Sequence, residues 1–156
     1  MGSSTGSEPW HCRQLTLKDK LAIETLYRAL VGAADIDIEQ LPKVLAHPGT
    51  TLWGALSDGK VAAMVTLHLL PNVTVAGRPY ALIENVVALP SAQGQGAGRA
   101  AMQAAIDHAR SKNAYKIMLL TMQDSGARGF YEKLGFRAEQ KFGMQLRRAP
   151  PRLLSG

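Results

Sequence analysis

A glycine-rich turn lies between a long apolar segment, residues 80–89, and an alanine-rich segment, residues 97–112, whose apolar period predicts a helix. The turn, residues 93–98, reads Gln-Gly-Gln-Gly-Ala-Gly. Glycine lets backbone atoms approach a ligand closely, and the first N–H groups of a helix have no internal acceptors. Together with the helix dipole, these donors favour a phosphate or pyrophosphate group. Taken by itself, the turn is explained equally well as a tight connection that binds nothing.

Two common phosphate-binding loops do not fit this turn. A dinucleotide-binding loop of pattern G-x-G-x-x-G requires a third glycine, but Arg99 stands at that position after Gly94 and Gly96. A nucleoside-triphosphatase loop requires Gly-Lys followed by Ser or Thr, and the segment has no such triplet. An anion bound here is therefore held by another type of loop.

Two polar residues, Glu84 and Asn85, interrupt the apolar segment 80–89. A buried strand seldom carries a carboxylate without a purpose, because burying an unpaired charge is costly. Glu84 is therefore a candidate functional carboxylate, and the alternative is a carboxylate hydrogen-bonded at a sheet edge or bulge. Asn85 either orients a substrate or stabilises such a bulge, and both interpretations stay open.

The remaining patterns predict the elements that position these residues. The Asp58-Gly59 pair between two apolar segments predicts a hairpin. A helix follows Thr16, which can cap it, and ends at Gly32. Further helices are expected at residues 37–46, which include a proline, and at residues 97–112 and 126–134. Strands are expected at residues 10–16, 51–56, 61–70, 80–89, 115–121 (as a central strand) and 141–146. This order predicts an α/β fold, with a mixed sheet flanked by helices.

The chain's length and composition are those of one small globular domain, with 156 residues and 46% hydrophobic side chains. We expect a flexible leader at residues 1–9, a single domain at residues 10–148 and a frayed tail at residues 149–156. No apolar segment approaches the roughly 20 residues that span a bilayer, and the leader lacks the features of a signal peptide. A cytoplasmic protein is expected. The single cysteine, Cys12, excludes an internal disulfide, and the histidines show no metal-ligand spacing.

The formal net charge of +6 is unevenly distributed. Residues 1–98 carry seven Lys and Arg against eight Asp and Glu, whereas residues 99–156 carry eleven against four. The basic excess contains no Arg- or Lys-rich run interleaved with aromatic residues, so we expect no nucleic-acid partner. It is either a solvated basic face or a site for a small polyanionic ligand.

Residues 82–136 resemble the core of the GNAT family of N-acetyltransferases. The defining positions of that family's coenzyme A loop, Arg/Gln-x-x-Gly-x-Gly/Ala, are occupied by Gln93, Gly96 and Gly98. Pro90 stands where the family commonly ends its fourth strand, and residues 130–136 match its F-Y-x-x-x-G-F signature. Residues 83–87 and 115–117 are also similar to the glucosamine-6-phosphate acetyltransferase branch.

The resemblance implies the fold and the reaction. The GNAT fold has a mixed, mostly antiparallel sheet of about six to seven strands with four helices, splayed at the cofactor site. The implied activity is acetyl transfer from acetyl-CoA, without a metal, to a primary amine of a small molecule or peptide, directly in a ternary complex. The alternative is a non-catalytic coenzyme A-binding sensor or interaction module. A homodimer is possible by analogy, and no membrane partner is expected.

The resemblance also implies roles for individual residues. Tyr131 corresponds to the general acid, and an ordinary tyrosine pKa near 10 suits proton donation at neutral pH. Glu84 would serve as base and, with Asn85, contact the acceptor. Asp124 stands where the family often has an asparagine that binds the cofactor. His68 is better explained as a satisfied core or edge histidine than as a second base. The cofactor-binding residues would be Val86, Val87, Ala88, Gln93, Gly94, Gln95, Gly96, Ala97, Gly98, Arg99 and Asp124.

Overall fold

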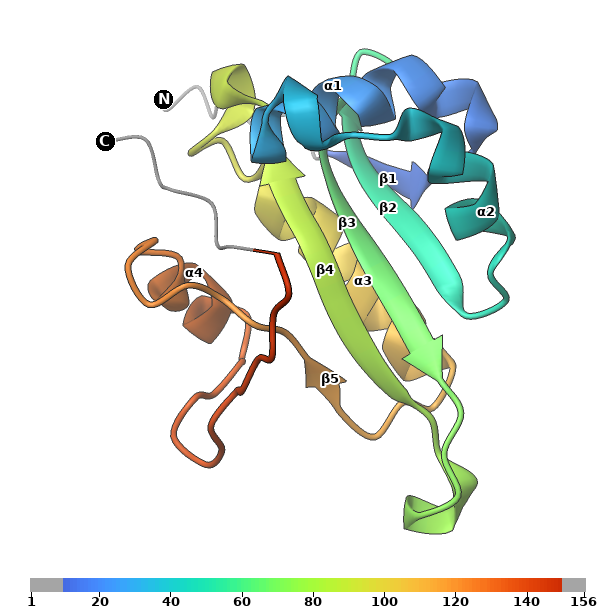
Figure 1. Cartoon of the computed structure of the whole chain (residues 1–156), viewed down its shortest axis with the longest axis vertical. Coiled ribbons are helices and arrows are strands. Elements are labelled where there is room, and N and C mark those ends of the chain that lie inside the picture. The colour runs from blue at the N-terminus through green and yellow to red at the C-terminus, as the bar shows by residue number, and fades with distance from the viewer. Residues whose placement is uncertain (1–9, 150–156) are drawn as a thin grey trace, which may run out of the picture. The chain divides into compact units, whose positions relative to one another are not determined.

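The computed structural model describes residues 10–149 (Figure 1). The predicted leader and nearly all of the predicted tail therefore lie outside the described residues. The chain divides into two compact units, an N-terminal unit, Met1–Leu119, and a C-terminal unit, Leu120–Gly156.

The N-terminal unit contains a five-stranded sheet in the order β1-β2-β3-β4-β5. The pairings β1–β2, β2–β3 and β3–β4 are antiparallel, and β4–β5 is parallel. The mixed, mostly antiparallel sheet predicted from the sequence is confirmed. The strands are β1 His11–Gln14, β2 Thr50–Ser57, β3 Lys60–Leu70, β4 Tyr80–Ala88 and β5 Ile117–Met118.

Two strand predictions were wrong, and the predicted number of strands, six to seven, is five within residues 10–149. The segment 115–121 forms only the two-residue β5, at the edge of the sheet and not at its centre. Residues 141–146 are not a strand, and their apolar side chains are exposed. A strand requires a partner to satisfy its backbone groups, and an apolar pattern does not say whether one is present.

The β2–β3 hairpin turns at Asp58 and Gly59, as predicted. Both residues have positive φ, 50° and 73°, which matches the twist of the two strands. The hairpin brings the two longest buried stretches of the sheet side by side, with Leu52, Met64 and Val65 fully enclosed.

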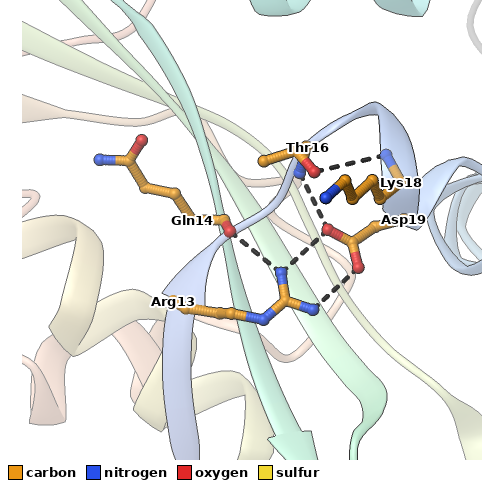
Figure 2. Close-up of polar contacts among 5 residues, drawn as sticks. All are labelled: Arg13, Gln14, Thr16, Lys18 and Asp19. Carbon is orange, nitrogen blue, oxygen red and sulfur yellow. Dashed lines mark hydrogen bonds and ion pairs between the residues drawn. The ribbon is translucent and has the colours of Figure 1, made fainter.

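Helix α1, Lys20–Val31, begins after a 3-10 turn, Leu17–Asp19, closed by a capping box between Thr16 and Asp19. The Thr16 hydroxyl accepts from the Lys18 N–H at 3.3 Å, and the Asp19 carboxylate accepts from the Thr16 N–H at 2.9 Å. Arg13 of β1 donates two hydrogen bonds of 2.9 Å to the same carboxylate (Figure 2). The predicted cap is confirmed, and Arg13 ties it to the sheet.

The other helices also lie close to the predicted segments. Helix α2, Leu41–Ala46, carries its proline in the first turn, where the missing N–H has no intrahelical partner to lose. Helix α3 spans Ala97–Ser111, and α4 of the C-terminal unit spans Arg128–Lys133. None of the helices within residues 10–149 is both long and apolar enough to cross a bilayer.

Helices cover both faces of the sheet. Residues of α1 and α2, including Ile23, Leu26 and Leu41, pack in one cluster with Leu52 and Met64. Side chains alternate between the two faces along a strand, so the residues next to Leu52 and Met64 point to the opposite face, which α3 covers (Figure 1). There the Trp53 ring contacts the ring of His108 on α3, with centroids 5.2 Å apart. We call the side of the sheet that packs against α1 the α1 face and the opposite side the α3 face.

Candidate active site

A β-bulge lies in the middle of β4. Across the β3–β4 ladder, Thr66 pairs with Glu84 and Met64 with Val87, so Asn85 and Val86 together lie opposite one residue of β3. Asn85 has φ 52°, in the left-handed region that asparagine tolerates better than most residues. The structure therefore places both Glu84 and Asn85 at a bulge, where their side chains are exposed.

The bulge accounts for the type of residue at position 85. A role for Asn85 in orienting a substrate stays a prediction. Residues paired across a ladder point to the same side of the sheet, so Glu84 shares a face with its partner Thr66. Thr66 lies two positions after Met64 on β3 and therefore on the same α1 face as Met64. Glu84 thus lies on the α1 face.

One edge of β4 is largely unpaired. β5 pairs with β4 only at Ala81 and Leu82, and no strand within residues 10–149 continues this pairing. On the other edge, the Leu89 N–H donates to the Ala62 carbonyl at 2.8 Å. Alternation along an antiparallel ladder then directs the N–H and C=O of Ala88 toward the unpaired edge. An extended ligand with amide groups could add to β4 at this position.

The glycine-rich turn follows directly. A 3-10 turn, Pro90–Ala92, ends β4, and helix α3 begins after Gly96. Gly94 and Gly96 have φ of 76° and 88°, which a residue with a side chain adopts only with strain. Space would not prevent a side chain at Gly94, because a Cβ added there would meet no atom within 4 Å. The backbone conformation is therefore the reason for glycine at these two positions.

The turn presents a row of unused donors. The first bond of α3 runs from the Ala100 N–H to the Gly96 carbonyl at 3.0 Å. Arg99, with an exposed side chain, adds a positive charge to the first turn of the helix. Free N–H groups at a helix start and a nearby cation fit a pyrophosphate. Within residues 10–149, no protein acceptor takes the amide N–H groups of Gly94, Gly96, Ala97, Gly98 and Arg99.

Trp10 holds this turn in place, a role that the sequence did not predict. Its indole Nε1–H donates to the Gln95 carbonyl at 3.0 Å, and the Gln95 side chain donates to the Ser91 carbonyl at 2.9 Å. Trp10 precedes β1 and is distant from the turn in sequence, so only the folded chain brings the two together. The one available sequence signal is that a half-buried indole N–H needs a hydrogen-bond acceptor, and this signal does not identify the acceptor.

Tyr131 and Asp124 belong to the C-terminal unit. The Tyr131 ring packs edge-on against Phe130 and Phe136, with centroids 5.1 and 6.1 Å apart. Gly135, at φ 98°, ends α4 so that the Phe136 N–H reaches the Tyr131 carbonyl at 3.1 Å. Burial raises the pKa of the Tyr131 phenol, which therefore stays protonated at neutral pH. Asp124 is exposed in the turn before α4.

An open pocket of about 340 Å³ lies elsewhere in the N-terminal unit. No predicted site residue lines it. It is formed by Lys18, Asp19, Leu21, Ala22, Thr25, Gly59, Lys60, Val61 and Leu89.

The N-terminal unit thus joins an unpaired strand edge, a bulge bearing a carboxylate and a helix start with unused N–H donors within one continuous segment, residues 84–99. The chain matches the acetyltransferase (GNAT) family over residues 16–136, which is more than half of its length. The chain belongs to this family of acetyltransferases, whose members use acetyl-CoA as co-substrate. The resemblance inferred from the two sequence motifs is therefore confirmed.

Individual relatives narrow the comparison. A glucosamine 6-phosphate N-acetyltransferase of Trypanosoma brucei brucei is 39% identical over 99 residues, covering 64% of this chain and 60% of the relative. The match thus spans less than two thirds of that relative's length. A solved structure titled "Putative acetyltransferase from Agrobacterium tumefaciens str. C58" is 37% identical, with a TM-score of 0.80 over 88% of this chain and 99% of that chain. A Trypanosoma brucei acetyltransferase structure is 28% identical, with a TM-score of 0.76 and the same coverage.

Proposed function

We propose that this protein is an acetyl-CoA-dependent N-acetyltransferase that transfers the acetyl group directly to a primary amine in a ternary complex. The observation that carries the proposal is the row of unused N–H donors in the turn 93–98 and at the start of α3, placed directly after the unpaired edge of β4. The relative that acts on glucosamine 6-phosphate makes this amino sugar the first acceptor to test.

The turn and strand edge would hold acetyl-CoA in two places. The N–H groups of Gly94, Gly96 and the first residues of α3 would bind the pyrophosphate, assisted by the charge of Arg99. The backbone of Ala88 at the unpaired edge would bind the extended pantetheine arm. Asp124 would contribute hydrogen-bond acceptors from the C-terminal unit. When bound, acetyl-CoA supplies a thioester-activated acetyl group.

Glu84 is assigned to the acceptor amine. An alkylamine with a pKa near 10.4 is protonated at neutral pH and cannot attack until it loses a proton. The exposed carboxylate at the bulge would bind this ammonium group and hold it where a base can remove its proton. Asn85, the adjacent residue with an exposed side chain, would help to orient the acceptor.

Tyr131 is assigned to donate a proton to the leaving sulfur of coenzyme A. The leaving sulfur requires a proton when the thioester bond breaks, and a phenol that stays protonated at neutral pH can donate it. The raised pKa of Tyr131 and its fixed position between two aromatic rings support this role.

The test compares acetyl-CoA binding by calorimetry in the wild type and in Gly96→Glu. We expect the wild type to bind and the variant to lose binding, because a side chain and a negative charge would enter the anion-binding turn. Gly32→Glu is the matched control, since Gly32 also has positive φ, at 84°, with no atom near its Cβ, and it lies at the end of α1. Equal binding by both variants would contradict the assignment of the turn.

Turnover is measured by release of the coenzyme A thiol with glucosamine 6-phosphate, followed by a panel of aminoglycosides, polyamines and peptides with free N-termini. Thiol release and acetylated product with one class would establish the enzyme and its acceptor. Tight binding without thiol release across the panel would favour the coenzyme A-binding sensor instead. No binding by the wild type would refute both.

A further inference from the structure

Three polar side chains form a hydrogen-bonded row on the α1 face of the sheet. The Thr50 hydroxyl lies 2.8 Å from Nδ1 of His68 and 2.9 Å from Nδ1 of His47. Thr50 and His68 are paired across β2 and β3, and the Thr50 N–H donates to the His47 carbonyl at 3.0 Å. His47 is exposed, Thr50 is 6% exposed and His68 is half-buried, so the hydroxyl at the centre of the row is its most buried group.

The His68 end of the row lies beside Glu84. His68 pairs with Leu82 and Thr66 with Glu84, so His68 and Glu84 are diagonal neighbours on the α1 face. The Glu84 charge raises the pKa of His68, but burial and the nearby His47 lower it more, and the net shift is downward. From α1, the Tyr27 hydroxyl approaches the same face, and burial raises its pKa while Thr66 lowers it in part. The Tyr27 hydroxyl does not form a hydrogen bond with Thr66, since Thr66 Oγ1 has no partner of hydrogen-bonding geometry among residues 10–149.

The single hydroxyl proton of Thr50 restricts the two rings. When both histidines are neutral, at most one Nδ1 can accept from Thr50, and the other must then donate to it. His47 is exposed and can satisfy its other nitrogen with water, so its Nδ1 is free to accept. In the arrangement in which His47 accepts, His68 carries its hydrogen on Nδ1, and its Nε2 keeps an unshared electron pair. A proton added at Nε2 reverses none of these hydrogen bonds, so the row is organised in advance for His68 to act as a base.

We propose that His68, oriented by Thr50 and His47, accepts the proton that the acceptor amine loses, while Glu84 stabilises the resulting imidazolium. The inference rests on the proposed N-acetyltransferase function. In the step, an N–H bond of the ammonium group breaks, its electron pair stays on nitrogen, and the proton bonds to Nε2 of His68. His68 returns the proton to solvent after transfer. His68 is then the catalytic base, and Thr50 and His47 are positioning residues.

The activity test is the pH profile of kcat/KM with the acceptor that supports turnover, glucosamine 6-phosphate first. We expect the wild-type rate to rise with pH through a value below the usual histidine pKa and then level off, because His68 must be neutral to accept a proton. His68→Gln should lose this limb and about 10²- to 10³-fold in kcat, with partial recovery at alkaline pH, where the free amine is more abundant. Thr50→Val should lower kcat about tenfold and shift the limb.

His108→Gln is the matched control. His108 is also half-buried with a lowered pKa, but it lies on α3 against Trp53, on the opposite face of the sheet. This variant should keep the wild-type limb and rate. Acetyl-CoA affinity should be unchanged in all of these variants, since none of the substituted residues belongs to the turn 93–98.

A second readout does not depend on turnover. Nitrogen-15 spectra of the imidazole rings, assigned with the single histidine variants, report which nitrogen of His68 carries hydrogen. Hydrogen on Nδ1 that shifts toward a mixture of forms in Thr50→Val would support the proposed row, whereas hydrogen on Nε2 would overturn it. Normal turnover with an unchanged pH profile in His68→Gln would overturn the inference alone. Failure of the wild type to bind acetyl-CoA would overturn the proposed function and this inference with it.

Discussion

The two compact units bury their side chains to different extents. Among residues 10–149, every buried apolar side chain belongs to the N-terminal unit, between Leu15 and Ala109. Helix α3, which starts at the glycine-rich turn, contributes six of these residues to the core, so the turn rests on a well-packed base. In the C-terminal unit, α4 has no buried residue. Large exposed apolar side chains of that unit are Leu120, Met122, Phe142, Met144 and Leu146.

This difference separates two ways of positioning a functional group. The proposed pyrophosphate site consists of backbone N–H groups whose directions are fixed by a packed helix and by positive-φ glycines. Tyr131 is one side chain on a short helix, oriented by two neighbouring rings. Substitutions in the glycine-rich turn and in the core beneath it should therefore change stability or cofactor affinity, whereas replacing the Tyr131 hydroxyl should change catalysis alone.

The largest expected effect is that of Tyr131→Phe. Removing the hydroxyl deletes the proposed proton donor but keeps the ring contacts, so kcat should fall about 10²- to 10³-fold. The acetyl-CoA dissociation constant and the melting temperature should stay near those of the wild type, as measured by calorimetry and thermal unfolding. Tyr115→Phe in the N-terminal unit is the control and should keep full activity. A matching loss of affinity in Tyr131→Phe would contradict the proposed separation.

Asn85→Val tests the bulge of β4. A β-branched residue at φ 52° is strained, so the free energy of unfolding should fall by about 1–3 kcal/mol in urea. Asn85→Gly accepts the same backbone conformation and should cost less. If activity drops in Asn85→Gly while stability is kept, the Asn85 amide contacts the acceptor. Equal stability of the two variants would mean that the bulge rearranges.

Asp19→Ala tests the cap that joins β1 to α1. Loss of the capping box should cost about 1 kcal/mol of unfolding free energy, and more if the Arg13 bonds add to it. Hydrogen bonding to Arg13 lowers the pKa of Asp19. The native state therefore binds this proton less readily than the unfolded state does, and the contribution of Asp19 is present above its unfolded pKa and lost as the pH falls through the lower native value.

The control for the loss of stability at low pH is Asp19→Asn, whose side chain has no charge to titrate. Its melting temperature should depend less steeply on pH below about 4 than that of the wild type. An identical dependence in both proteins would show that Asp19 carries none of the acid sensitivity.

Trp10→Phe should give the smallest effect. The variant loses one hydrogen bond to the Gln95 carbonyl, worth about 1 kcal/mol, so acetyl-CoA affinity should fall about fivefold in calorimetry. Trp53→Phe also loses an indole hydrogen bond, to the Thr51 hydroxyl in β2, and should leave affinity unchanged. An equal loss of affinity in both variants would mean that the turn is not held by Trp10 in particular.

Most helices and the first four strands could be predicted because their signals are local. The Thr16 cap, the Asp58-Gly59 hairpin and the apolar period of α3 each depend on residues within a few positions of one another. The predictions failed for residues 115–121 and 141–146. Both segments have apolar patterns suited to a strand, but strand formation depends on a partner that lies elsewhere in the chain.

The sequence by itself determined the family, the glycine-rich turn and the aromatic signature around Tyr131, because residue type and spacing within short segments specify these motifs. Only the tertiary structure decided that Trp10 holds the turn and that His47, Thr50 and His68 form one row beside Glu84. These residues meet through strand pairing and through contacts between distant segments. Side-chain chemistry limits which partners each of them accepts, but only the register of the sheet determines which partner is within reach.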